Sequence, residues 1–556
     1  IVECSPSQFI RKPSVFLMTS GAPTVYQLTA KKQTAGGLRR MTFGEKDPRK
    51  QNKTILLVGE TGTGKSTLIN ALVNYAMGVE WEDNVWFKFV EDLEGEEDKE
   101  RNQSESQTSD VIVYQIFGFE GKTMPCSLTI IDTPGYGDTR GTEKDDIVKL
   151  RLLDLFRSED GVHEINAVAL VLKASENRVS DRLRYIFDSV VSLFGKDMEK
   201  NFVAFITHSD GLPPDNVLKA LEDANIRFAK DEDNEPVYFM FNNCQNTQKT
   251  KKTMFALKAA WDLTKDQIKQ LADFLEKESP QNLKKTVEVL NSRIRLTACI
   301  QSLQDRIGLT EMKQKEIQQT QEALKKYEEE MKNNENFTVE VDEPYKDKEK
   351  INGGWWFWGW ANWKFTKLFY EGAVCCTVCE ETCHYPGCTV AAIPELCEIM
   401  KDGHCTSCTG KCPVSAHVKE EWIYVNKTRK VQKTRQEMKE KYEKNKAQND
   451  RQQNLLEILK KKKHDLHNDK EQLLDESFQH IVTLENIALN DNSISTLQHL
   501  DFLIEKMTER GDKEKTEKLE QMKSRMDKDK GIRAALRYGF GKVAAFGRAA
   551  FEALVK

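Results

Sequence analysis

The sequence predicts an α/β P-loop domain with a doubly wound, mainly parallel sheet, followed by a long α-helical coiled-coil hairpin that carries a small Cys-rich β module, and then an amphipathic helix. Three observations predict this order. A glycine-rich loop separates an apolar run from a helix-like run near residue 60. Strand-like and helix-like stretches alternate over residues 51–275, as they do in a wound parallel sheet. Charged, helix-favouring sequence then flanks a compact cysteine cluster.

Length and changes of composition give the expected boundaries. A chain of 556 residues should hold several domains, because about 100–200 residues per domain is usual. The formal net charge of -5 gives no case for nucleic-acid binding. No run is apolar and long enough to predict a transmembrane helix. The expected segments are an N-terminal arm at 1–50, the P-loop domain at 51–275, a first stalk part at 276–336, a Trp- and Cys/His-rich tip module at 337–425, a second stalk part with a further helix at 426–528, and a basic amphipathic helix at 529–556.

The loop at residues 59–67 predicts a phosphate-binding site. It matches G-x(4)-G-K-[ST], and the apolar runs at 55–58 and 68–73 predict the strand and the helix that this motif requires. Backbone N–H groups of such a loop form an anion nest, and the helix N-terminus favours phosphate. Lys65 would lie near the β and γ phosphates, and Ser66 would ligate Mg²⁺. The alternative, a plain glycine turn, leaves the lysine and the hydroxyl unexplained. The expected nucleotide contacts are Gly59, Glu60, Thr61, Gly62, Thr63, Gly64, Lys65, Ser66 and Thr67.

Two further segments predict the rest of the magnesium and γ-phosphate site. Asp132 ends the apolar run 128–131 and can hold Mg²⁺ through water, while the N–H of Gly135 can sense the γ-phosphate. Thr108 lies in a polar loop where a first switch would supply a hydroxyl to Mg²⁺. The alternatives are a plain turn and an ordinary polar loop. The expected catalytic residues are Lys65, Thr108 and Gly135.

The residue after Gly135 is Tyr136. Ras-like enzymes carry a glutamine there that positions the attacking water. Its absence predicts slow hydrolysis by the isolated subunit, or hydrolysis completed by a partner subunit.

Two segments predict contacts to the base. Asp210 follows the apolar run 201–206, and its carboxylate can accept two hydrogen bonds from N1 and N2 of guanine. Adenine offers no such pair, so Asp210 would favour GTP over ATP. His208 could stack on the base or be an ordinary surface histidine. A second strand-like run, 237–241, ends in Asn242 and Asn243, which suits a second base-contacting loop.

Four of these segments carry a resemblance to a known family. Residues 59–67, 132–135, 161–172 and 241–243 resemble motifs of the immunity-associated GTPases (the GIMAP family), relatives of the septins and the chloroplast import GTPases. The start of the segment Thr207–Asp210 resembles the chloroplast import GTPases, and the common Asn-Lys-x-Asp form is absent there. The resemblance covers residues 51–275 and implies an α/β P-loop GTPase domain. It also implies a GTP-dependent switch, cycling between GTP and GDP, that dimerises through its nucleotide face and often assembles on membranes.

The cysteine cluster predicts metal binding. Nine of the thirteen cysteines lie between Cys375 and Cys412, and Cys-x2-Cys lets two thiolates reach one tetrahedral Zn²⁺. Two repeated sets of four ligands predict two structural Zn²⁺ ions. The spare residues Cys375, Cys397, His384 and His404 leave an interleaved pairing open, and free or disulfide-bonded cysteines are the alternative. The first set is Cys376, Cys379, Cys383 and Cys388, and the second is Cys405, Cys408, Cys412 and His417.

The remaining segments predict a stalk and two contact surfaces. Helix-favouring stretches at 280–333 and 428–488, with strand-like runs at 337–341 and 422–425 between them, predict an antiparallel hairpin with the module at its tip. Unrelated helices in one bundle are the alternative. The five tryptophans of 355–363 predict a membrane or protein contact, or a small core. The terminal helix would bind a membrane surface, dock on the chain or another copy, or stay disordered.

Together these features predict a guanine-nucleotide-binding protein that hydrolyses GTP slowly and controls its dimerisation or oligomeric assembly by nucleotide state. Its expected partners are further copies of itself and a membrane surface reached through the terminal helix, and its expected location is the cytoplasm. The alternative is a coiled-coil and zinc scaffold that self-assembles with nucleotide as a structural ligand. An ATPase is a third alternative, which Asp210 argues against.

Overall fold

A computed structural model describes most of the chain, and its residues form two compact units. The first unit consists of the described residues of Ile1–Leu290, Glu485–Leu497 and Met522–Lys556, and the second of those of Asn291–Leu484 and Gln498–Gln521. No helix in the described part of the chain is long and apolar enough to cross a membrane. The described residues are 7–10, 15–35, 38–90, 111–121, 123–134, 143–176, 181–223, 228–326, 338–351, 372–385, 388, 393–434, 455–488 and 494–528.

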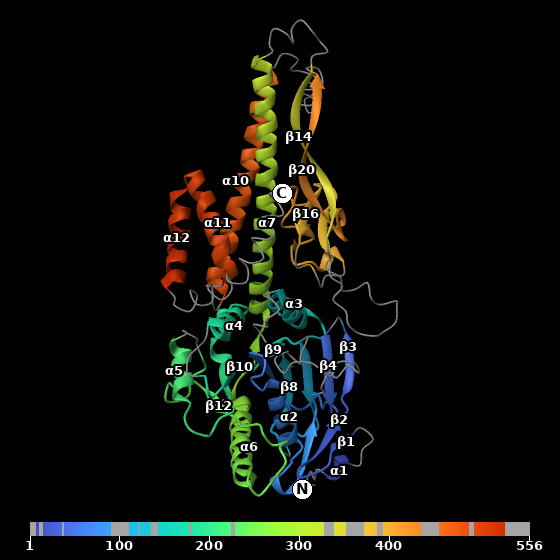
Figure 1. The fold of residues 1–556 in the computed structure, drawn as a ribbon, viewed down its shortest axis with the longest axis vertical. Coiled ribbons are helices and arrows are strands. Elements are labelled where there is room, and N and C mark those ends of the chain that lie inside the picture. Colours follow the sequence, from blue (N-terminus) through green and yellow to red (C-terminus); the bar gives the residue numbers. More distant parts are fainter. Residues whose placement is uncertain are drawn as a thin grey trace. The chain divides into compact units, whose positions relative to one another are not determined.

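An eight-stranded sheet forms the centre of the first unit (Figure 1). Its order is β12-β11-β10-β5-β8-β7-β4-β3. The strands from β12 to β8 are parallel, whereas β7 runs antiparallel to β8 and β3 antiparallel to β4. The strands are β3 (Lys31–Ala35), β4 (Leu38–Phe43), β5 (Asn52–Gly59), β7 (Ile112–Ile116), β8 (Ser127–Asp132), β10 (Ala167–Lys173), β11 (Phe202–Thr207) and β12 (Tyr238–Met240).

Both faces of this sheet are covered, as its continuous apolar strands require. Ile55 and Leu57 of β5 pack into a large core with α2 and α6 on one face, while Leu56 and Val58 are buried on the other face, where α4 contacts β5. A small sheet of order β1-β2-β6 packs into the same large core as α2 and α6. The other elements of this unit are α1 (Ser7–Ile10), β1 (Val15–Thr19), β2 (Thr24–Leu28), α2 (Lys65–Ala76), η1 (Trp81–Asp83), β6 (Val85–Lys88), α3 (Glu143–Arg157), β9 (Glu164–Ile165), α4 (Asp181–Val191), η2 (Lys196–Asn201), α5 (Asp215–Asp223), α6 (Met254–Lys277) and β13 (Gln281–Asn282).

The N-terminal segment is not the separate arm that the sequence predicts. Strand β4 pairs in parallel with β7, and β3 pairs with β4, so residues 31–43 extend the central sheet. The prediction was wrong because β4 carries two adjacent arginines, Arg39 and Arg40, before the buried side chains Met41 and Phe43. A strand of this kind has too little hydrophobic alternation to be recognised in a single sequence.

The second unit is built on the long helix α7 (Lys284–Lys326), which begins in the first unit. A two-stranded ribbon of β14 (Thr338–Lys350) and β20 (Trp422–Thr434) follows it, paired along its whole length from Thr338↔Thr434 to Lys350↔Trp422. The predicted strands at 337–341 and 422–425 are therefore present but longer, and residues 428–434 are strand rather than helix.

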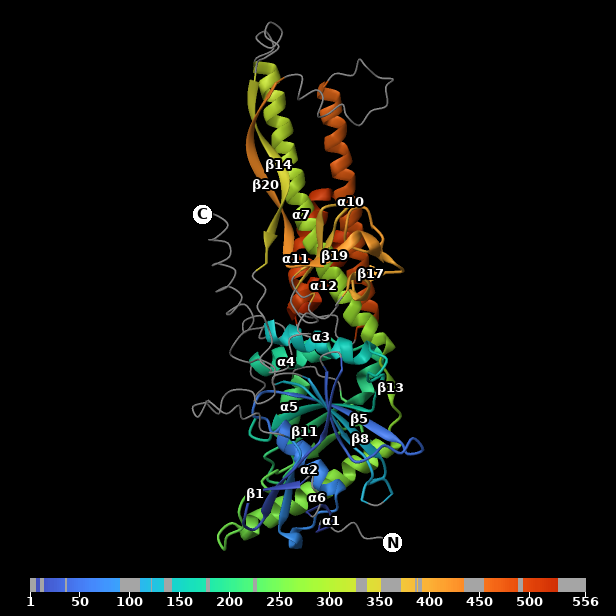
Figure 2. The same cartoon turned by 90° about the vertical axis from the view of Figure 1, so that its right-hand side faces the viewer.

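The ribbon runs back along α7 (Figures 1 and 2). Near the far end of the helix, Gln319 accepts a hydrogen bond of 2.9 Å from the N–H of Asp342. Further back, the amide of Asn426 donates to the carbonyl of Asp305 at 3.0 Å. The ribbon thus carries the inserted residues toward the middle of α7, and the predicted position of the module at the tip of the stalk is wrong.

Three more helices belong to this part of the chain: α10 (Leu455–Ile487), α11 (Ile494–Arg510) and α12 (Lys513–Lys528). Both views show α10 beside α7 and running in the opposite direction (Figures 1 and 2). Arg510 of α11 and Lys515 of α12 reach the same carboxylate, Asp475 of α10, at 2.5 and 2.6 Å. The further helix predicted within residues 426–528 is therefore two helices, separated at Gly511, whose φ is 79°.

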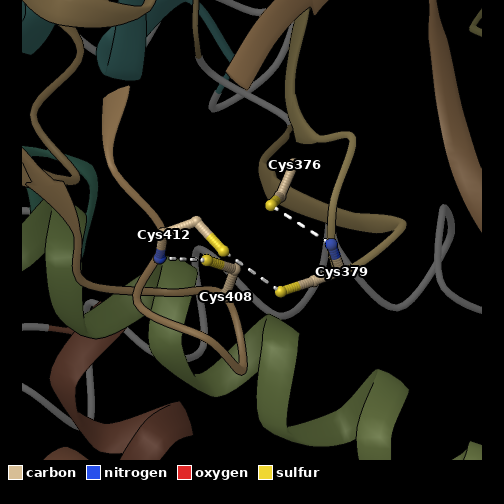
Figure 3. A group of neighbouring side chains, drawn as sticks. All are labelled: Cys376, Cys379, Cys408 and Cys412. Carbon is tan, nitrogen blue, oxygen red and sulfur yellow. Dashed lines mark hydrogen bonds between the residues drawn. The ribbon is translucent and has the colours of Figure 1, made fainter. Parts of the chain in front are cut away.

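A compact cysteine module lies against the side of α7. A three-stranded sheet of order β16-β15-β19 and a short hairpin of β17 and β18 bring Cys376 and Cys379 beside Cys408 and Cys412 (Figure 3). Ala298 of α7 packs in the same core as these cysteines. The module consists of β15 (Ala373–Cys376), β16 (Glu381–His384), η4 (Pro394–Leu396), β17 (Met400–Lys401), β18 (His404–Cys405), η5 (Val414–Ala416) and β19 (His417–Glu420).

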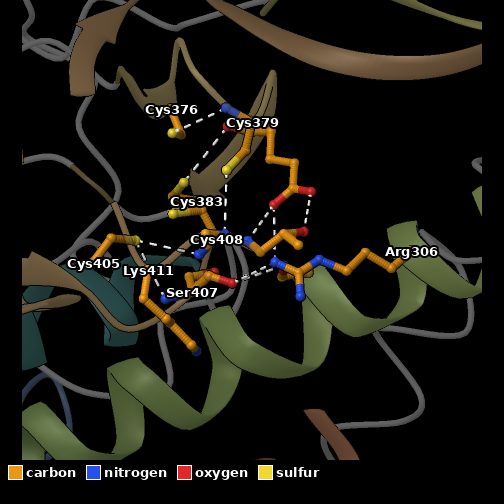
Figure 4. A network of polar contacts seen from close by, with 12 residues as sticks. Arg306, Cys376, Cys379, Cys383, Cys405, Ser407, Cys408 and Lys411 are labelled. Atoms are coloured by element: carbon orange, nitrogen blue, oxygen red, sulfur yellow. Dashed lines mark hydrogen bonds and ion pairs between the residues drawn. The ribbon is translucent and has the colours of Figure 1, made fainter. Parts of the chain in front are cut away.

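One arginine ties the module to the helix (Figure 4). The guanidinium of Arg306 donates 2.9 Å hydrogen bonds to the carboxylate of Glu381 and to the carbonyl of Ser407. The side chains of Arg306 and Glu381 are only 13% and 15% exposed. Because Glu381 also accepts from the N–H of Thr409 at 2.8 Å, this ion pair joins three segments of the unit.

Substitution of Arg306 should loosen the module. We expect Arg306→Met to weaken the packing of the module on α7 by about 3 kcal/mol, because the largely buried carboxylate of Glu381 loses its closest cation and keeps only Lys346, at 3.8 Å. Hydrogen exchange should accelerate in peptides covering residues 372–385 and 404–412 and stay unchanged in β5. The matched control is Arg429→Met, which removes an ion pair to Glu343 whose arginine is 60% exposed and should have little effect. Equal exchange in the two variants would contradict the assigned role of Arg306.

Candidate functional site

The predicted phosphate loop lies between β5 and α2, as the motif requires. Gly62 and Gly64 have φ of 78° and 89°, which is the left-handed region that glycine adopts without strain. A Cβ on Gly59 would lie 2.5 Å from the carbonyl oxygen of Val171, so the loop must approach β10 closely. The first N–H groups of α2 therefore open onto the loop, with Ser66 and Thr67 in the first helical turn.

Lys65 lies inside this loop. Its ammonium donates to the carbonyls of Gly59 and Glu60 at 2.9 and 3.0 Å. Burial lowers the pKa of Lys65 to about 8, and the carboxylates of Asp132 and Glu60 act in the opposite direction. An ammonium has three donors, so two carbonyl contacts leave one N–H for a phosphate oxygen. The loop thus holds a buried cation at the position where phosphate charge would arrive.

Asp132 lies beside the loop because of strand pairing. It is the last residue of β8 and pairs with Leu57 of β5, two positions before Gly59. The side chain of Asp132 is fully buried, and the hydroxyl of the next residue, Thr133, donates to the carbonyl of Leu57 at 2.9 Å. A carboxylate near Lys65 and Ser66 has the oxygen chemistry that Mg²⁺ prefers. The residues present therefore fit a magnesium ion.

Thr207 connects the loop that follows β11 to the phosphate loop, a role that the sequence reasoning missed. Its hydroxyl lies 2.7 Å from the carbonyl of Thr63 and 3.0 Å from that of Leu172. His208, with φ of 55°, lies 3.1 Å from the same hydroxyl through Nδ1. A buried threonine at the end of an apolar strand is the signal that could have indicated this connection.

The predicted base-contacting residues come together at the ends of β11 and β12. The side-chain amide of Asn242 donates to the carbonyl of Ser209 at 2.9 Å, which joins the two loops. Asp210 is exposed, and its Oδ1 accepts from the N–H of Leu212 at 3.0 Å. Both polar side-chain atoms of Asn243 are buried without a hydrogen-bond partner in the described part of the chain. Such an amide is costly unless a ligand satisfies it, so its position fits a polar base.

Several predicted residues lie outside the described residues. These are Thr108 and Gly135, with the neighbouring Tyr136, the tryptophan-rich run 355–363 and the terminal segment 529–556. Their predicted roles stay predictions.

The cysteine module forms three groups of side chains that could each hold a metal ion, and the grouping differs from the predicted one. Each predicted set of four is divided between groups. Within each group the ligand atoms lie within 4.8 Å of one another. The groups are Cys376, Cys379, Cys408 and Cys412; Cys383, Cys405, Cys408 and His417; and His384, Cys388 and Cys397.

These groups have the geometry of thiolate ligands rather than disulfides. The sulfurs of Cys379 and Cys412 are 3.6 Å apart, well beyond the roughly 2.05 Å of an S–S bond. All cysteines in the described residues are free. Hydrogen bonds from Cys383 and Cys405 hold the pKa of the Cys408 thiol below its usual value. The interleaved pairing, left open by the sequence, is therefore the arrangement that the fold produces.

The buried ammonium of Lys65 predicts how the stability of the nucleotide-free protein depends on pH. Its folded-state pKa of about 8 lies below the value of roughly 10.4 for an exposed lysine, so the unfolded chain binds more protons between these pH values. The free energy of unfolding of the wild type, relative to that of Lys65→Met, should therefore rise by roughly 3 kcal/mol from pH 8 to 10.5. Scanning calorimetry of both proteins, in buffers without phosphate or sulfate, measures this difference. A difference that falls with rising pH would contradict the prediction.

Part of the chain is similar to known proteins. Residues 49–148, less than half of the chain, match the family model described as Septin. A search of curated proteins gives no match. A dimerisation-deficient mutant of Toc33 from Arabidopsis thaliana is 17% identical with a TM-score of 0.29, over 41% of this chain and 87% of that one. Arabidopsis Toc33 with Mg²⁺ and GMPPNP is 18% identical with a TM-score of 0.28, over 41% and 87%.

At these TM-scores the likeness to solved structures carries no argument of its own. The septin match, in contrast, includes both the phosphate loop and Asp132. The site described above therefore lies in the segment that is similar to the septins, and the chain carries the domain of a GTP-hydrolysing enzyme.

Proposed function

We propose that this chain is a GTP switch: it binds GTP or GDP with Mg²⁺, hydrolyses GTP slowly, and changes its self-association with the bound nucleotide. The observation that carries the proposal is the convergence of Lys65, Asp132 and Thr207 at one edge of the parallel sheet. The carboxyl ends of parallel strands are where such sheets bind their ligands.

Each residue has a distinct task in this proposal. The ammonium of Lys65 neutralises charge on the β and γ phosphates, and the backbone N–H groups of the loop orient them. The hydroxyl of Ser66 and the carboxylate of Asp132 would hold the magnesium ion, which supplies charge stabilisation when bound. Because Lys65 is buried among backbone carbonyls, its charge acts in surroundings of low dielectric constant.

Guanine selection would come from the loops after β11 and β12. Asp210 is exposed, and its carboxylate would accept from N1 and N2 of guanine. The buried side-chain amide of Asn243, which has no hydrogen-bond partner in the described part of the chain, would then form hydrogen bonds with the base. His208 would stack on the ring. Specificity for guanine therefore depends on one carboxylate and one otherwise unsatisfied amide.

The cysteine module would hold zinc as a structural cofactor. Two of its three groups supply four cysteine or histidine ligands each and leave no open position, which is typical of structural sites. Zinc would fix the module on α7, which gives the second unit a rigid surface for self-association. Contact with a membrane through residues 529–556, a cytoplasmic location and membership of the immunity-associated GTPases belong to the same proposal.

Nucleotide selectivity gives a direct test. Asp210→Asn should lower affinity for GDP at least tenfold and raise affinity for xanthosine diphosphate, because the amide can donate to the oxygen at position 2 of xanthine. Titration calorimetry with GDP, ADP and xanthosine diphosphate measures this exchange. Lys65→Ala should bind none of the three measurably. The matched control is Asp215→Asn, at the start of α5. Equal affinity of the wild type for GDP and ADP would remove guanine specificity from the proposal.

Assembly gives the second test. The mass of the full chain in solution, measured by light scattering with GDP and with a non-hydrolysable GTP analogue, should increase only with the analogue. Turnover per subunit should rise with protein concentration, because Tyr136 does not replace a water-positioning glutamine. One large species with both nucleotides would favour the alternative of a zinc and helical scaffold. Fast turnover at all protein concentrations would also contradict the switch.

A further inference from the structure

The three metal-ligand groups of the module differ in one respect. Cys408 belongs to two of them, whereas the group of His384, Cys388 and Cys397 shares no residue with the others. The two groups that share Cys408 together contain six cysteines and His417. One tetrahedral ion takes four ligands, so a single ion would leave three of these buried groups without metal.

We propose that the module binds three metal ions of the zinc type: two joined by the thiolate of Cys408, and a third with three of its four positions filled by His384, Cys388 and Cys397. This inference rests on the zinc binding proposed above and not on the nucleotide site. A thiolate sulfur has more than one lone pair and can bind two ions at once. Each ion of the pair then has four protein ligands, with Cys408 counted in both sets.

The backbone around the pair is arranged for thiolates. The N–H groups of Ser407 and Cys408 both donate to the sulfur of Cys405 at 3.3 Å. The N–H of Cys412 donates to the sulfur of Cys408 at 3.2 Å, and that of Gly410 donates to Cys379 at 3.3 Å. Hydrogen bonds to an ionised acceptor stabilise its charge, so these amides support a cluster with an excess of thiolates over metal charge.

Gly410 has a steric reason to be glycine. A Cβ at this position would lie 3.0 Å from the sulfur of Cys412 and 3.3 Å from that of Cys379. Both sulfurs belong to the first ion's set. The turn therefore leaves just enough room for two thiolates to converge beside its backbone.

His417 presents one ring nitrogen to the second set. Its Nδ1 lies 3.0 Å from the carbonyl of Pro413, which fixes the proton on that nitrogen. Its Nε2 is buried and has no hydrogen-bond partner in the described part of the chain. A histidine that binds metal through one nitrogen and donates from the other to a carbonyl is the usual arrangement of such ligands. The unsatisfied nitrogen beside Cys383, Cys405 and Cys408 thus indicates a metal ion.

The third group shares no ligand with the other two. Nδ1 of His384 lies 3.1 Å from the sulfur of Cys397, and the sulfurs of Cys388 and Cys397 are 3.9 Å apart. All three residues are at most 5% exposed. The carboxylate of Glu398, also buried, lies 3.9 Å from the same Nδ1. A divalent cation would balance this concentration of buried thiols beside an acid, which apolar surroundings would otherwise disfavour.

Metal counting on the full chain, purified under reducing conditions, tests the proposal. The wild type should hold three zinc ions. Cys408→Ser should hold one, because both ions of the pair lose a ligand, and Cys397→Ser should hold two. The matched control is Cys375→Ser, a buried cysteine next to Cys376 that belongs to none of the groups and should leave three ions.

X-ray absorption at the zinc edge tests the bridge without any variant. Two Zn–S bonds of about 2.3 Å meeting at a near-tetrahedral sulfur place the ions about 3.8 Å apart. A zinc–zinc scattering distance near this value supports the pair, and its absence in a zinc-loaded wild type overturns the bridge. An unchanged count in Cys397→Ser overturns the third site.

The nucleotide site provides an independent readout. GDP affinity of Cys408→Ser and Cys397→Ser should equal that of the wild type, which also shows that the first unit is folded. A wild type that binds GDP but holds no zinc overturns the metal proposal and leaves the GTP switch intact. A chain that holds three zinc ions but binds no nucleotide supports the metal proposal and overturns the GTP switch.

Discussion

The parallel pairing of β5 with β8 and β10 is the constraint on which the nucleotide site depends. Its register places Asp132 opposite Leu57 and Val171 opposite Gly59, so the acid and the glycine loop end at the same edge of the sheet. The absence of a side chain on Gly59 permits the close approach to β10. Without this pairing Lys65 would lose both its buried position and the nearby carboxylate of Asp132 that favours its charge.

A similar dependence links the ribbon to the cysteine module. The pairing of β14 with β20 over thirteen residues, together with hydrogen bonds to α7 at Gln319 and Asp305, determines where the insert lies. Arg306 then holds the module on the helix through a largely buried ion pair. The thiol groups consequently meet on a rigid support, which is what a structural metal site requires.

The predictions that succeeded rested on local patterns. The glycine loop with its flanking strand and helix, the strand before Asp132 and the strand before Thr207 each depend on short-range preferences, so they were visible in one sequence. The predictions that failed depended on distant partners. Strand β4 joins the sheet through β7, some seventy residues later in the chain, and has little hydrophobic pattern of its own. The predicted grouping of the metal ligands was wrong because the repeated cysteine spacing identifies the ligands but does not show which of them lie close together in space.

The sequence by itself determined the phosphate loop and the side chains that are available for chemistry: acids at Asp132 and Asp210, and a set of cysteine and histidine ligands. Residue type and spacing are enough for this, because each such site uses a small number of side chains with particular donor atoms. The tertiary structure alone decided that Thr207 bonds to the phosphate loop, that the module lies beside α7, and that Cys408 stands between two ligand sets. These outcomes depend on strand register and on the path of the ribbon, which bring together residues far apart in the chain.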